Sequence, residues 1–418
     1  MIVSFAVKNF RSIRDLQVLA MNAARIVSKD KELDATNLID ISPKLKLIKS
    51  KAIYGANASG KSTMMRALSA FVHIAIQSVK EDSSLKKWID PFNLSDNDPL
   101  EPTYFQLTFI YNEILYRYGY EANANEIKSE WLFGTPGKKE VPFFTRNGND
   151  IKVNINQFEE GAKVIDLYKQ SDNDIARPNS LFLTTVRSFN QGLARQLIDY
   201  FSRYIIISGL ADKKMRLITH QFMEQEPMRL KIVELLKLAD VGIDDIQRQE
   251  FSPEDAPPSA DDRYFTLTSH KRFDKDGKPS GQVLFEMVTG ESQGTQKMFE
   301  ISIALLQSLE EGRVLIMDEF DARFHPLLSR RIVELYNSAS NKKAQLIYAT
   351  NDTNLLNPQL LRRDQICFVE KDKQGASHFY SLVDFKGVRN DASFEKDYVA
   401  GKYGAIPFLG DFTSLIED

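Results

Sequence analysis

The stretch Gly55–Ser62, G-A-N-A-S-G-K-S, constrains this chain more than any other, because it fits the phosphate-loop pattern G-x-x-x-x-G-K-[ST] without a gap. A short, mostly apolar run at residues 51–54 reads as a strand before it, and residues 63–72 read as a helix. A strand, a glycine-rich turn and a helix in that order are the context in which this pattern binds phosphates. The sequence therefore predicts a nucleotide site, with ATP and Mg2+ as the expected ligands and GTP as an alternative.

Each residue type in the motif has a physical task. Gly55 and Gly60 let the backbone turn tightly enough to aim N–H groups at the phosphates, and the helix N-terminus adds its partial positive charge. Lys61 is expected to neutralise the β- and γ-phosphates, and Ser62 to offer its hydroxyl to Mg2+. The other expected nucleotide contacts in the loop are Asn57, Ser59 and Thr63.

A second motif, residues 314–319, has the sequence V-L-I-M-D-E. Four apolar residues in a row indicate a strand covered on both faces, and the acids come at its C-terminal end, where open α/β sheets place their ligands. We expect Asp318 to hold Mg2+ and Glu319 to orient or deprotonate the attacking water, since phosphoryl transfer depends on positioning and charge neutralisation.

Composition excludes several classes. The 418 residues are 43% hydrophobic and 27% charged, typical of one large or two modest globular domains. No run approaches 18 apolar residues, and the start lacks the features of a signal peptide. With Cys367 as the single cysteine, we expect a cytoplasmic protein without a membrane partner. The net charge of -3 gives no global basic field.

The order of elements predicts an α/β fold in which an insertion separates two halves of one nucleotide site. We assign residues 1–155 to an N-terminal half with the phosphate loop and an antiparallel meander over 104–144, residues 156–250 to a helical lobe interrupted by a strand at 203–208, and residues 251–418 to a C-terminal half. Strands at 263–269 and 282–288 are expected to flank a polar loop at 271–281, and 252–262 reads as a surface loop. The last third alternates strands and helices, which predicts a parallel core with an antiparallel edge.

Ser292-Gln-Gly294, at the start of a predicted helix, resembles the signature sequence of ABC-type ATPases. In that group the serine and glycine grip the γ-phosphate bound to the opposite subunit, so the resemblance implies a homodimer that sandwiches ATP. Phe320-Asp321-Ala322 is similar to the loop that contacts the dimer partner in those proteins. Residues 8–11, K-N-F-R, resemble the N-terminal turn of the RecF, SMC and Rad-type branch, in which an arginine, here Arg11, reaches the nucleotide.

Further segments look like the prokaryotic ATP-binding proteins of the abortive-infection and OLD-like group. They are residues 291–328, 362–366, 401–407, 91–92 and 101–107. The resemblance implies a P-loop NTPase of ABC/SMC-like type that serves as one half of an antiphage defence pair. The chain departs from the pattern at Asn351, where a switch histidine is expected after the strand at 344–349. Because asparagine cannot become a cation near neutral pH, we expect slow hydrolysis with binding intact.

No effector chemistry is visible in the sequence. A Toprim module, a His-Asn-His nuclease pattern and a zinc-spaced Cys/His cluster are all missing, so the effector is expected to be a separate partner such as a nuclease subunit. One alternative is a RecF-like repair ATPase that binds nucleic acid through basic residues of the helical lobe, which are Arg187, Arg195, Arg203, Lys213, Lys214 and Arg216. The ATP subunit of a transporter and a scaffold without hydrolysis are two others.

Overall fold

A six-stranded sheet forms the centre of the computed structural model, which describes residues 1–28, 30–96, 98–169, 177–189, 192–210, 213–239, 242–251, 263–388, 393–407 and 410. Its strands, in spatial order, are β11 (Ile205–Ser208), β15 (Val314–Asp318), β16 (Gln345–Ala349), β5 (Ser50–Tyr54), β17 (Ile366–Lys371) and β18 (Ser377–Ser381). The first five run parallel, and β18 pairs antiparallel with β17. The predicted parallel core with an antiparallel edge is confirmed.

Helices cover both faces of this sheet, which explains why its central strands are apolar throughout. Alternate residues point to opposite sides. Ile316 and Ile347 face the cluster that contains α2 (Lys61–Gln77), whereas Leu315 and Leu346 face the cluster with α10 (Gln293–Glu311) and α11 (Pro326–Asn337). The phosphate loop and the acidic motif therefore both lie at one edge of a sheet that is packed on both faces.

A seven-stranded antiparallel sheet packs on the far side of α2. It includes the predicted meander, and its spatial order is β10 (Asp150–Val153), β9 (Val141–Asn147), β8 (Ile127–Thr135), β7 (Ile114–Ala122), β6 (Thr103–Tyr111), β1 (Ile2–Lys8) and β2 (Gln17–Ala20). Phe71 of α2 stacks on Tyr120 with ring centroids 5.6 Å apart and meets Phe5 edge-on at 5.7 Å. Aromatic packing thus fixes α2, and with it the phosphate loop, between two sheets.

Residues 156–250 divide between two hydrophobic clusters. α4 (Glu159–Lys169), α5 (Phe182–Arg187) and α6 (Gly192–Phe201) pack beside α2, whereas α7 (Lys213–Phe222) and α8 (Glu226–Leu238) pack on α10. The strand between these two groups, β11, joins the central sheet next to β15. The inserted helical lobe is therefore anchored to the core by a strand, and the domain boundaries given above stay a prediction.

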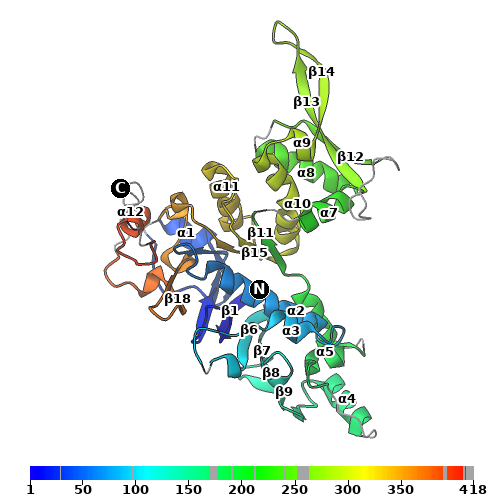
Figure 1. Ribbon diagram of the computed structural model, residues 1–418, viewed down its shortest axis with the longest axis vertical. Helices are drawn as coiled ribbons and strands as arrows, with labels where there is room; N and C mark the ends of the chain where they lie inside the picture. Colours follow the sequence, from blue (N-terminus) through cyan, green and yellow to red (C-terminus); the bar gives the residue numbers. More distant parts are fainter. Residues whose placement is uncertain are drawn as a thin grey trace, which may run out of the picture.

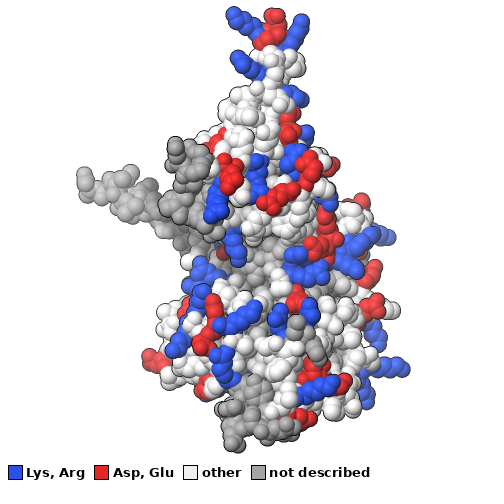
Figure 2. Space-filling view, turned by 90° about the vertical axis from the view of Figure 1, so that its right-hand side faces the viewer, with Lys and Arg blue, Asp and Glu red and all other residues white. Residues whose placement is uncertain are grey.

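A three-stranded sheet of β12 (Asp245–Glu250), β13 (Tyr264–Phe273) and β14 (Pro279–Glu286) ends in a long hairpin that projects from the body (Figure 1). The polar loop predicted at 271–281 is too long, because backbone pairing carries the ladder to Phe273 and Pro279 whatever the side chains are. The loop predicted at 252–262 lies outside the described residues. Figure 2 shows lysine or arginine and acidic side chains together at the tip of the hairpin.

Smaller elements complete the part of the chain that the structure describes. They are α1 (Lys31–Thr36), β3 (Leu38–Ser42), β4 (Leu45–Ile48), α3 (Ser84–Trp88), α9 (Met287–Gly290), α12 (Phe394–Val399) and 3-10 turns at 98–100, 353–355, 363–365 and 382–384. Among the helices of the described ranges, none combines the length and the apolar character needed to cross a membrane.

Candidate nucleotide site

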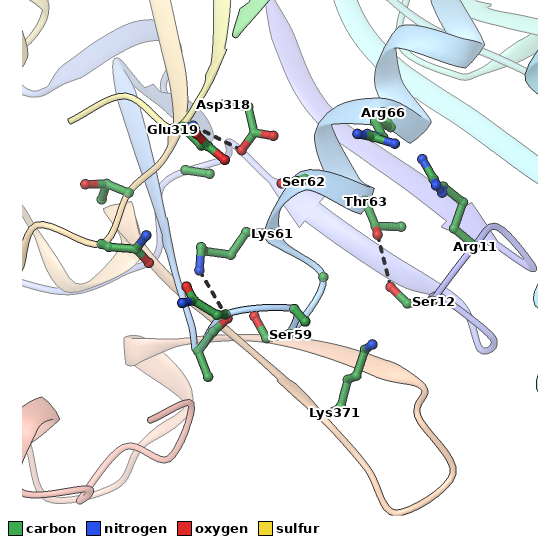
Figure 3. A pocket seen from close by; sticks show the side chains of 17 residues that line it. Arg11, Ser12, Ser59, Lys61, Ser62, Thr63, Arg66, Asp318, Glu319 and Lys371 are labelled. Atoms are coloured by element: carbon green, nitrogen blue, oxygen red, sulfur yellow. Dashed lines mark hydrogen bonds between the residues drawn. The ribbon is translucent and has the colours of Figure 1, made fainter. Parts of the chain in front are cut away.

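A cavity of about 390 Å3 opens where β5, β15 and β16 end, between the phosphate loop and the acidic motif (Figure 3). Strands that run parallel bring their C-terminal ends to the same edge, so residues far apart in the sequence meet there. Ten of the residues predicted for the site line this cavity: Arg11, Asn57, Ser59, Gly60, Lys61, Ser62, Thr63, Asp318, Glu319 and Asn351.

Hydrogen bonds from neighbouring hydroxyl groups hold the phosphate loop in place. Ser377 of β18 donates its hydroxyl proton to the carbonyl of Ser59 at 2.6 Å, and its oxygen lies 2.8 Å from the hydroxyl of Ser12. Gly60 has φ +117°, and a Cβ there would lie 2.2 Å from the Ser377 oxygen. Both the backbone angle and the close approach therefore require glycine at position 60.

Lys61 turns back over its own loop. Its ammonium donates to the carbonyl oxygens of Gly55 at 2.6 Å and Ala56 at 3.1 Å. Burial lowers the pKa of Lys61, and the nearby carboxylates of Asp318, Asp321 and Glu319 oppose this shift. Gly55 thus contributes through its backbone and does not itself line the cavity.

The residues present fit a polyphosphate with Mg2+. No side chain caps α2 at Gly60, so the first N–H groups of this helix are available to an anion. The hydroxyl of Ser59 is buried and has no hydrogen-bond partner among the residues that the structure describes. Ser62 and Asp318 both line the cavity, and no cluster of three metal-ligating side chains exists in the described ranges. Such a sparse donor set suits Mg2+, which usually takes one or two protein groups and completes its shell with phosphates and water.

Backbone strain positions Glu319. This residue has φ +49°, a conformation rarely adopted by a residue with a long side chain, at a cost of roughly 1–3 kcal/mol. Gly209, which follows β11, donates its N–H to the carbonyl of Asp318 at 2.7 Å. A Cβ on Gly209 would lie 2.0 Å from the carbonyl oxygen of Glu319. Gly209 is a supporting residue that the sequence reasoning missed, although a glycine directly after a predicted strand is a signal for such close approach.

Asp321 connects the acidic loop to the end of β16. Its carboxylate accepts hydrogen bonds from the Thr350 hydroxyl at 2.6 Å and from the Asn351 N–H at 3.1 Å. Asn351 is exposed and lines the cavity, whereas Asp321 does not line it. Asp321 was predicted to contact the nucleotide, but in this chain it instead holds Thr350 and Asn351 and does not line the cavity.

Ser292 and Gly294 do not line the cavity. Ser292 is exposed and caps α10, accepting the N–H of Thr295 at 3.2 Å. A Cβ on Gly294 would lie 3.0 Å from the carbonyl oxygen of Arg323. The predicted signature thus sits on the surface at a helix N-terminus.

Seven further residues line the cavity, and three of them, Ser12, Arg66 and Lys371, lie outside the motifs identified from the sequence. Arg66 lies four residues after Ser62 on α2, and this helical spacing could have revealed it. Arg11, which was predicted, has φ +51° and forms an ion pair of 3.2 Å with Asp90. Together Arg11, Arg66 and Lys371 add positive charge to the wall of the cavity (Figure 3).

Comparison with known proteins identifies the family. Residues 52–357 match the family described as AAA domain, putative AbiEii toxin, Type IV TA system. No curated protein has a significant match to the chain.

Three solved structures of SMC heads are similar over most of their length. An SMC head bound to the C-winged helix domain of ScpA shares 16% identity, with 91% of this chain and 97% of that chain covered and a TM-score of 0.44. The SMC head domain from Thermotoga maritima shares 12% identity, with coverages of 91% and 98% and a TM-score of 0.42. An SMC head domain with an extended coiled coil, bound to the C-terminal domain of ScpA derived from Pyrococcus furiosus, shares 15% identity, with coverages of 96% and 98% and a TM-score of 0.41.

Proposed function

We propose that this chain, which belongs to the AAA-domain family described as putative AbiEii toxin of type IV TA systems, is an ABC-type ATPase that dimerises around ATP and regulates a partner effector. The observation that carries this proposal is that the phosphate-loop and acidic residues line one cavity, whereas the signature residue Ser292 lies outside it. One cavity gathers the phosphate loop, Asp318 and Glu319, while Ser292 stays exposed on the surface. A second subunit placed head to tail brings an exposed Ser292 to that cavity.

Each group that lines the cavity has its own role in the proposed binding and hydrolysis of ATP. The N–H groups at the start of α2 and the ammonium of Lys61 bind the phosphates, and Arg11 contacts the nucleotide. Ser62 and Asp318 would hold Mg2+, which neutralises phosphate charge when bound. Glu319 accepts a hydrogen bond from the attacking water and aligns it with the terminal phosphate. Asn351 offers that phosphate a neutral donor, so hydrolysis is slow while binding is retained.

The signature completes the site from the other subunit. Ser292 and Gly294 begin α10, a helix of 19 residues whose N-terminus is suited to an anion. Asp321 lies in the adjacent loop and contacts the opposite subunit on closure. ATP then becomes part of the dimer interface, and its hydrolysis opens that interface.

The effector is a separate protein, such as a nuclease, in a prokaryotic antiviral defence system. The support is the family description, which names a toxin of a toxin–antitoxin system, together with the lack of a nuclease motif in the sequence. ATP-dependent closure of the dimer is a two-state event, so it can hold or release such a partner.

A sizing experiment tests the sandwich. Glu319→Gln should bind ATP without hydrolysing it and elute as a dimer with ATP and Mg2+ and as a monomer without them. The same column run with Glu319→Gln/Ser292→Arg is the control and should give a monomer in both conditions. A dimer that ignores ATP, or one that tolerates the bulky arginine at position 292, would count against the proposal.

The alternative of a RecF-like ATPase that binds DNA through the helical lobe has less support. Arg187 and Arg195 both pair with Asp199, Arg203 pairs with Glu311, and Arg216 pairs with Glu300. Ion pairs with these three carboxylates offset part of the charge of the four arginines, which weakens their attraction for phosphates. Salt-sensitive, ATP-dependent binding of duplex DNA to the isolated protein would favour this alternative.

A further inference from the structure

Lys297 is an ionisable side chain at a buried position, where an apolar side chain would avoid the cost of removing a charge from water. It lies on α10, five residues after Ser292, and is 2% exposed. Its ammonium donates to the carbonyl oxygens of Phe320, at 2.8 Å, and Ala322, and it lies 4.1 Å from the ring centroid of Phe324. The carboxylates of Asp321, Glu319 and Glu300 favour its charged form, but the cost of burial is larger. Because a buried ionisable group is costly even with such neighbours, its retention calls for a reason beyond packing.

The two carbonyl groups that Lys297 binds belong to the loop that carries Asp321. From the other side, this loop is held by the end of β16, where Thr350 and the N–H of Asn351 donate to Asp321. The N–H of Phe320 also donates to the carbonyl of Ala349 at 2.9 Å. The loop is thus clamped between the helix that begins with the signature and the strand end that faces the cavity.

We infer that Lys297 is a positioning residue that couples the two nucleotide sites of the dimer. Asn351 lines the cavity of its own subunit, and any displacement of Asn351 pulls on Asp321 and its loop. Lys297 transmits that displacement to α10, whose first residues, Ser292 and Gly294, meet the nucleotide of the other subunit. The state of one site therefore sets the placement of the signature at the other. This inference rests on the proposed ATP-sandwich dimer.

The chain offers matched variants for a test. Lys297→Met keeps length and removes the charge and both hydrogen bonds, whereas Lys297→Arg keeps a cation. Lys49→Met is the control, because Lys49 is also buried and also donates to a backbone carbonyl, that of Ser338. Lys49 directly precedes β5, so it lies at the end of that strand that is away from the cavity. Thr350→Val releases the same loop from its other side without touching Lys297.

The measurements are the affinity for a fluorescent ATP analogue, ATP-dependent dimerisation by sedimentation, and the Hill coefficient of phosphate release. We expect Lys297→Met to bind the analogue with an affinity within about threefold of wild type. Its turnover should fall roughly 10²-fold, as expected for a misplaced catalytic group. Its Hill coefficient should be 1. Lys297→Arg should recover much of the turnover, and Lys49→Met should behave as wild type. The double variant Lys297→Met/Thr350→Val should be no slower than Lys297→Met alone, because both changes release one loop.

Several results would overturn the inference. Wild-type turnover and cooperativity in Lys297→Met would do so, as would effects of Lys297→Met and Thr350→Val that multiply independently. If circular dichroism shows that Lys297→Met does not fold, the same cycle is run with Lys297→Gln and Thr350→Val, because glutamine also removes the charge. Failure of the wild-type protein to dimerise with ATP would instead refute the proposed function, so the two failures are distinguishable.

Discussion

Gly209→Ala should abolish most ATP hydrolysis while leaving nucleotide binding and folding largely intact. Gly209 is buried, and the added Cβ would lie 2.0 Å from the carbonyl oxygen of Glu319 and 2.8 Å from its carbonyl carbon. Side-chain carbons essentially never come within 3.0 Å of such atoms, so the backbone of Glu319 must move by about 1 Å or more. The strained backbone at Glu319, with φ +49°, has little freedom to absorb this shift.

The size of the effect follows from that displacement. A catalytic group misplaced by about 1 Å costs on the order of 10²-fold in rate, or roughly 2.7 kcal/mol of barrier. Overpacking of a buried position costs roughly 1–3 kcal/mol in unfolding free energy. Phosphate release at saturating ATP measures the first quantity, and urea unfolding the second. Nucleotide affinity should stay within about threefold, because Gly209 does not line the cavity.

The matched control is Gly137→Ala. Gly137 lies in the exposed loop between β8 and β9, and a Cβ there would meet no atom within 4 Å. This variant should hydrolyse ATP as the wild type does. Equal turnover in Gly209→Ala and Gly137→Ala would refute the argument that Gly209 sets the position of Glu319.

Three further predictions concern the site and its supports. Asn351→His should raise turnover severalfold in steady-state assays, because histidine can place a positive charge beside the terminal phosphate; unchanged turnover would show that the switch position does not limit the rate. Lys61→Ala should lose the thermal stabilisation by ATP, which for the wild type should reach about 2.7 kcal/mol at a hundredfold excess over Kd; an equal shift in melting temperature would exclude Lys61 from binding. Burial lowers the pKa of Lys297 to about 7 from its ordinary 10.5. Between these two pKa values the unfolded chain binds more protons than the folded chain does. The free energy of unfolding should therefore rise with pH, by up to about 1.4 kcal/mol per pH unit for this group. Urea unfolding at pH 7 and pH 9 should show a smaller rise for Lys297→Met than for the wild type.

The sequence was sufficient to predict the parallel core of the central sheet and ten of the residues that line the cavity. The phosphate loop and the V-L-I-M-D-E run each combine a buried strand with polar residues at its C-terminal end. Two such strands in one parallel sheet bring those ends together, and the structure places β5 and β15 on either side of β16. Local patterns of this kind determine both the fold and the position of the site.

Contacts between distant segments could not be predicted in the same way. β11 reads as an isolated strand within a helical region, and its pairing with β15 depends on packing that no local pattern shows. The approach of Gly209 to Glu319 and the burial of Lys297 against Phe320 follow from that packing. Lysine on a helix normally suggests a solvated charge, so sequence alone gives no reason to expect it in the core.

Mixing two inactive variants tests most directly whether two subunits complete each other's nucleotide sites. Lys61→Ala lacks the phosphate-binding ammonium, and Ser292→Arg lacks a functional signature. In a head-to-tail heterodimer of the two, one site combines an intact Lys61 with an intact Ser292, so each heterodimer has one working site of two. The mixture should therefore recover up to about half of wild-type turnover when all subunits are in heterodimers. A mixture as inactive as either variant alone, although heterodimers form, would contradict the account.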